Sequence, residues 1–147
     1  MKFTSIIKPI MLFCFIFSLQ VQAQYQIPSQ ERVETLLEQI DNCKRITTET
    51  EQLIETMEAN PESYSLKDYN SAKELLERAK SCINISRGEL DSLRKKFPGW
   101  FNSPNATMQL GRGNEITPRQ LEKKVNDLDA KIRAVLERFN SIDNPDD

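Results

Sequence analysis

Histidine is absent from this chain of 147 residues. Because histidine is the commonest general base and metal ligand at neutral pH, its absence removes the usual forms of both kinds of site. Aromatic residues are also few, at 7% of the chain, whereas charged residues make up 29%. This balance is typical of a small bundle of solvent-exposed helices.

Long apolar runs are also lacking. The longest, Ile10 to Leu19, has about half of the roughly 20 residues that a membrane-spanning helix needs. Lysines precede this run, and Val21-Gln22-Ala23 after it places small residues where a signal peptidase reads the chain. Residues 1–23 are therefore predicted to be a signal peptide cleaved before Gln24, rather than an uncleaved membrane anchor. The product is expected in a periplasm or outside the cell, with no membrane span after cleavage.

An excess of basic residues is missing as well. The whole chain has a formal net charge of −2, and removal of the signal peptide, which contains two lysines and no acids, makes this about −4. Nucleic-acid binding depends on a concentrated basic surface, so nucleic acid is not an expected partner. Another protein is the expected partner, and its identity is not encoded in any motif.

Cysteine is sparse, since only Cys43 and Cys82 follow the predicted signal peptide. An even pair in an oxidising compartment most simply forms one disulfide bond. Two unpaired thiols in the core are the alternative.

Three segments carry apolar residues at alternating steps of three and four, the spacing of one helical face. Helices are predicted over about 29–58, 66–97 and 117–142, with a turn after the first and a long loop over 98–116. The third has the clearest start, because Thr117-Pro118-Arg119-Gln120 combines an N-cap, proline at the first helical position and a capping box.

These regular stripes predict an all-α fold, in which three long helices form an antiparallel, coiled-coil-like bundle within a single domain, 24–147. Cys43 and Cys82 lie at nearly equal distances from the turn between the first two helices, so a hairpin there brings them together. The first helix carries a net charge of about −5 and the second about +2, which also favours their pairing.

No pattern in the sequence predicts a catalytic, cofactor-binding or metal-binding residue. Asp127-x-Asp129 resembles the start of a calcium loop, but the required glycine is missing and the twelfth position is Arg138. The protein is therefore predicted to be no enzyme and to hold no cofactor. A cavity lined by small residues such as Ala72 and Ala79 would be needed for the alternative of a small-ligand carrier or an enzyme of unknown type.

The segment around the end of the second helix departs from the regular pattern. Arg94-Lys95-Lys96 is followed closely by Trp100 and Phe101, a combination that suits docking to a partner or to an anionic membrane surface. The alternative is that the two rings plug the open end of the bundle while the cations complement the helix dipole. Asn105 begins an Asn-Ala-Thr sequon and is the better glycosylation candidate if the source is eukaryotic.

Two functions from different classes follow from these observations. The first is an exported, non-enzymatic protein-interaction module that presents a helix face or the 94–117 segment to another protein. The second is a structural protein that associates with further copies of itself through a free helical seam.

Overall fold

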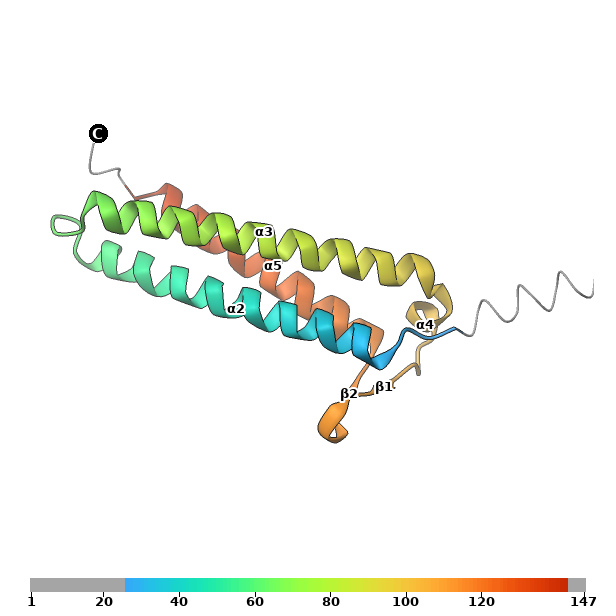
Figure 1. The fold of residues 1–147 in the computed structure, drawn as a ribbon. Helices are drawn as coiled ribbons and strands as arrows, with labels where there is room; N and C mark the ends of the chain where they lie inside the picture. The colour runs from blue at the N-terminus through green and yellow to red at the C-terminus, as the bar shows by residue number, and fades with distance from the viewer. Residues whose placement is uncertain (1–25, 143–147) are drawn as a thin grey trace, which may run out of the picture.

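The computed structural model describes residues 26–142, which form three long helices packed against each other (Figure 1). They are α2 (Gln30–Ala59), α3 (Leu66–Lys96) and α5 (Pro118–Asn140). Helix α3 runs antiparallel to the other two, so α2 and α5 are parallel to one another. The prediction of an all-α three-helix bundle is confirmed, whereas the predicted signal peptide, residues 1–23, lies outside the described residues.

Each long helix begins at a residue that supplies the missing hydrogen-bond acceptor for its first turn. The Ser29 hydroxyl accepts from a backbone N–H of α2, and capping boxes formed by Ser65 with Asp68 and by Thr117 with Gln120 start α3 and α5. Such caps stabilise a helix by about 1 kcal/mol each. The ends of the helices are therefore fixed locally, before any contact between helices is considered.

The core is built from the apolar stripes of the three helices. Its larger part gathers around the end of the bundle where α2 begins, and a smaller cluster occupies the opposite end. Three buried polar residues, Thr47, Thr50 and Ser86, satisfy their hydroxyls by donating to the backbone carbonyl four residues earlier in the same helix. None of these three buried hydroxyls is therefore left without a hydrogen-bond partner.

A disulfide bond joins Cys43 of α2 to Cys82 of α3, with a Cα–Cα distance of 5.6 Å. The prediction from their positions about the turn is thus confirmed. Both cysteines lie near the middle of their helices, so the bond fixes the register of α2 against α3 directly.

The segment between α3 and α5 contains more structure than the plain loop predicted over 98–116. It holds the short helix α4 (Pro98–Asn102), then strands β1 (Met108–Gln109) and β2 (Glu115–Ile116), joined through a 3-10 turn at Gly111–Gly113. Met108 and Ile116 face each other in the antiparallel register and are both buried. Their burial against the end of the bundle explains why so short a hairpin is stable.

None of the helices within residues 26–142 is both long enough and apolar enough to cross a membrane.

Reduction of the disulfide is expected to lower the melting temperature by about 10 °C or more, because in the chain-entropy model the bond contributes about 3 to 4 kcal/mol. The estimate follows from the 39 residues that separate Cys43 from Cys82. Thermal unfolding followed by circular dichroism, with and without reductant, measures the effect. The double variant Cys43→Ala/Cys82→Ala is the control, because its melting temperature should not respond to reductant. Identical curves for the natural chain in both conditions would contradict the prediction.

Candidate functional site

The aromatic pair that follows α3 lies at the end of the bundle. Trp100 is only 3% exposed and belongs to the main core cluster. Phe101 packs edge-on against it, with the ring centroids 5.1 Å apart, and is itself half-buried. Trp100 therefore occupies the position of a plug and offers no accessible ring to a partner.

Arg94 is engaged within the fold. Its guanidinium forms an ion pair with Glu122 of α5 at 2.6 Å, a second with Asp91 at 3.2 Å, and lies 5.8 Å from the centre of the Phe101 ring. Lys95 and Lys96 are exposed and make no ion pair within the described part of the chain. The five residues predicted as a docking group are therefore divided between side chains that contact the rest of the fold and side chains that are exposed, and their docking role stays a prediction.

Asn105, the predicted glycosylation candidate, is exposed in the connection between α4 and β1.

The charges of α5 fall on two faces. Toward α3 it presents carboxylates, and Arg87 pairs with Asp129 at 3.0 Å in the same seam that holds the Arg94–Glu122 pair. Between α2 and α3 themselves, Arg32–Glu89 is the only ion pair within residues 26–142. The charged residues of α2 and α3 thus pair mainly with residues of α5 and seldom with each other.

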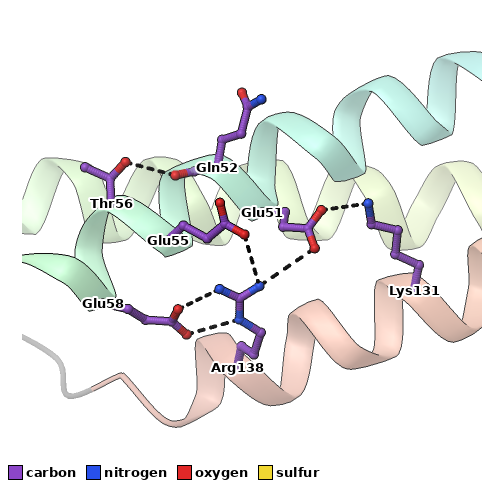
Figure 2. Close-up of polar contacts among 7 residues, drawn as sticks. All are labelled: Glu51, Gln52, Glu55, Thr56, Glu58, Lys131 and Arg138. Carbon is purple, nitrogen blue, oxygen red and sulfur yellow. Dashed lines mark hydrogen bonds and ion pairs between the residues drawn. The ribbon is translucent and has the colours of Figure 1, made fainter.

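Toward α2, α5 presents cations, which meet a row of glutamates (Figure 2). Lys131 forms an ion pair with Glu51 at 2.6 Å, and Arg138 donates two hydrogen bonds to the Glu58 carboxylate, at 3.1 and 2.6 Å. Arg138 also lies 3.6 Å from Glu55. The hydrogen bonds from Arg138 hold the pKa of Glu58 below its usual value.

The two main pairs of this seam share one register. Glu51 with Lys131 and Glu58 with Arg138 are each 80 residues apart, and the two pairs are seven residues from each other. One heptad toward the beginning of α2, the same register places Lys44 opposite Lys124. Both lysines are exposed, neither makes an ion pair within the described residues, and both line the same surface hollow. At this position two lysines face each other, whereas the next two positions of the seam hold acid–base pairs. We call each such pair of facing residues a rung of the seam, and Lys44–Lys124 is a like-charged rung.

This hollow continues into a larger one, and together they form a groove between α2 and α5. Their volumes are about 230 and 480 Å³, and they share Asp41, Lys124 and Asp127. We call this continuous surface the α2–α5 groove. It is lined by Leu37, Ile40, Asp41, Lys44, Leu110, Asn114, Glu115, Ile116, Gln120, Lys123, Lys124, Asp127, Leu128 and Lys131.

The groove combines an apolar floor with a charged rim. Lys123 is paired with Asp127 and Lys131 with Glu51. Among the described residues, the lysines Lys44 and Lys124 and the carboxylates Asp41 and Glu115 of the lining make no ion pair. Apolar surface beside unpaired cations is a combination suited to an acidic segment of another chain.

The hairpin β1–β2 closes one end of the groove, since Leu110, Asn114, Glu115 and Ile116 belong to its lining. The hairpin is tied to α2 by Glu34, whose carboxylate accepts a hydrogen bond from the backbone N–H of Gly111 at 2.6 Å. That bond and a second from Gln30 hold the pKa of Glu34 below its usual value. The closed end is therefore a defined wall rather than an open loop.

The described residues do not bring together a group that could hold a metal ion. The sequence analysis did not predict the α2–α5 groove. Its signal is a pair of lysines one heptad from two acid–base pairs, and this pattern can be recognised only once the register of α2 against α5 is known.

Fold and groove together define an elongated, disulfide-linked three-helix bundle with a groove between α2 and α5. No protein-family model, curated protein or solved structure matches the chain.

Replacement of Trp100 by alanine is expected to destabilise the domain by about 3 to 5 kcal/mol, because it leaves a large cavity at the end of the core. Chemical denaturation measures this. Phe101→Ala is the matched control and should cost less, since that ring is only half-buried. The natural chain, which has a single tryptophan, should show emission that is blue-shifted from that of the denatured chain. Solvent-like emission from the folded chain would contradict the burial of Trp100.

Lys44→Glu is expected to stabilise the domain, because it replaces the like-charged rung by a Glu–Lys pair in register with the two below it. Exposed pairs contribute up to about 1 kcal/mol, so the melting temperature should rise by about 2 to 4 °C at low salt. The gain should shrink at high salt, where exposed charges are screened. Lys73→Glu, at an exposed position of α3 outside the groove, is the control and should show no gain. A Lys44→Glu variant that melts at or below the natural chain would refute the facing arrangement of Lys44 and Lys124.

Proposed function

We propose that the protein is an exported, non-enzymatic interaction module that binds another protein chain along the α2–α5 groove. The observation that carries this proposal is the unpaired Lys44–Lys124 rung above an apolar floor. Every other rung of the seam from Glu51 to Arg138 is closed by acid–base pairs.

The unpaired rung is more readily explained by binding than by folding. A single glutamate at position 44 would complete the ladder, so folding stability alone favours a different residue there. Sites that give up stability in this way are typical of surfaces with a function. A carboxylate supplied by a partner would complete the rung in the complex instead.

The groove also offers what a docking segment needs besides charge. Ile40, Ile116 and Leu128 are largely buried residues that form its floor, and the half-buried side chains of Leu37 and Leu110 extend it. Apolar contacts of this kind supply most of the affinity in protein interfaces, whereas rim charges supply orientation and specificity. The hairpin wall sets where a bound segment must end.

Export is supported by the predicted signal peptide together with the disulfide bond. Disulfides persist in oxidising compartments, and Cys43–Cys82 joins the middle of two core helices. The proposed setting is therefore a periplasm or the cell exterior, where a small disulfide-linked module can meet other exported chains.

Site-specific photocrosslinking in cells of the source organism tests this function. A photoreactive amino acid is placed at Gln120, an exposed residue of the groove, and separately at Arg78, an exposed residue of α3 outside it. We expect a discrete protein adduct from Gln120 that Arg78 does not give and that Lys44→Glu abolishes. Adducts that are the same from both positions, or that survive Lys44→Glu, would show that the groove is not the binding surface.

A further inference from the structure

We propose that the chain bound in the α2–α5 groove is a second copy of this protein, whose acidic segment 143–147 pairs with Lys44 and Lys124. This inference rests on the proposed function of the groove and names its partner. The segment reads Asp143-Asn144-Pro145-Asp146-Asp147, with three acids and no base in five residues.

The chemistry of the groove asks for such a segment. The register of α2 and α5 places Lys44 and Lys124 opposite each other, and both line the same hollow, so an anion between them would contact two cations. The lining of the groove carries four lysines against three carboxylates, Asp41, Glu115 and Asp127, so its net charge attracts an acid. Several carboxylates in a short stretch satisfy both lysines at once.

The same copy is poorly placed to fill its own groove. In the sequence the acidic segment follows Ile142. The end of α5 that precedes it lies away from the β1–β2 hairpin (Figure 1). Lys124 lies about 27 Å back along the helix axis from Ile142, whereas five extended residues span about 17 Å. The return path also passes Glu58, Glu55 and Glu51, which repel an acidic chain.

A second copy removes both obstacles. When two molecules lie side by side through their α2–α5 faces with opposite directions, the far end of each is beside the groove of the other. The acidic segment of each molecule then meets the lysines of its neighbour, and both sites are filled by one twofold axis. Such an isologous arrangement closes on itself as a dimer and does not grow into a filament.

The association is tested by sedimentation equilibrium of the disulfide-bonded chain 24–147. We expect a monomer–dimer equilibrium at low salt. Two variants should each weaken it by about tenfold or more, because each removes two or three exposed charge contacts. They are Asp143→Asn/Asp146→Asn/Asp147→Asn and Lys44→Gln/Lys124→Gln. Lys95→Gln/Lys96→Gln is the control, since it removes the same charge from exposed, unpaired positions outside the groove.

A charge exchange makes the test specific to this pairing. A chain with Lys44→Glu and Lys124→Glu should not dimerise, and adding Asp143→Lys, Asp146→Lys and Asp147→Lys to it should restore the dimer. Restoration supports the proposal, because unrelated effects of the five substitutions do not predict it.

Two results would overturn the proposal. One is a strict monomer at all concentrations, and the other is a dimer that none of the variants weakens. In either case the photocrosslinks from Gln120 decide separately whether the groove binds a different protein, so the proposed function can stand while the second copy is rejected.

Discussion

The Cys43–Cys82 bond is the constraint on which the rest of the bundle depends. It fixes the register of α2 against α3 at the middle of both helices. Within residues 26–142, Arg32–Glu89, at the start of α2, is the single ion pair between these two helices. With that register set, the apolar stripes of the two helices present one continuous surface. Helix α5 packs on this surface, and its position determines every charged contact of the two remaining seams.

Most ion pairs between helices involve α5, and few join α2 directly to α3. One face of α5 carries Glu122 and Asp129 toward the arginines of α3, while the other carries Lys131 and Arg138 toward the glutamates of α2. Each exposed pair contributes little. If α5 were rotated so that its two faces were exchanged, however, its carboxylates would face the glutamates of α2 and its cations would face the arginines of α3. The pairs therefore select direction and register more than they add stability.

Local signals in the sequence predicted most of this fold. Capping residues and three-four spacing gave the three helices, and symmetric placement about a turn gave the disulfide. The hairpin β1–β2 was missed, because strands of two residues carry no periodicity and depend on the burial of Met108 and Ile116 against the bundle. The groove was missed because it depends on the register of α5 against α2. The connection between α3 and α5 sets that register, and no local sequence pattern encodes it.

Lys44 and Lys124 lie where their charges can affect binding without being needed for folding. Both side chains are exposed at the rim, so changing their charge creates no cavity and buries no polar group. The contacts that fix these helices, the disulfide and the ion pairs of Glu51 and Glu58, do not involve the side chains of Lys44 or Lys124. A bundle that is already fixed by those contacts can tolerate one repulsive rung. A carboxylate that neutralises the rung in a complex therefore contributes to association without being needed for the fold.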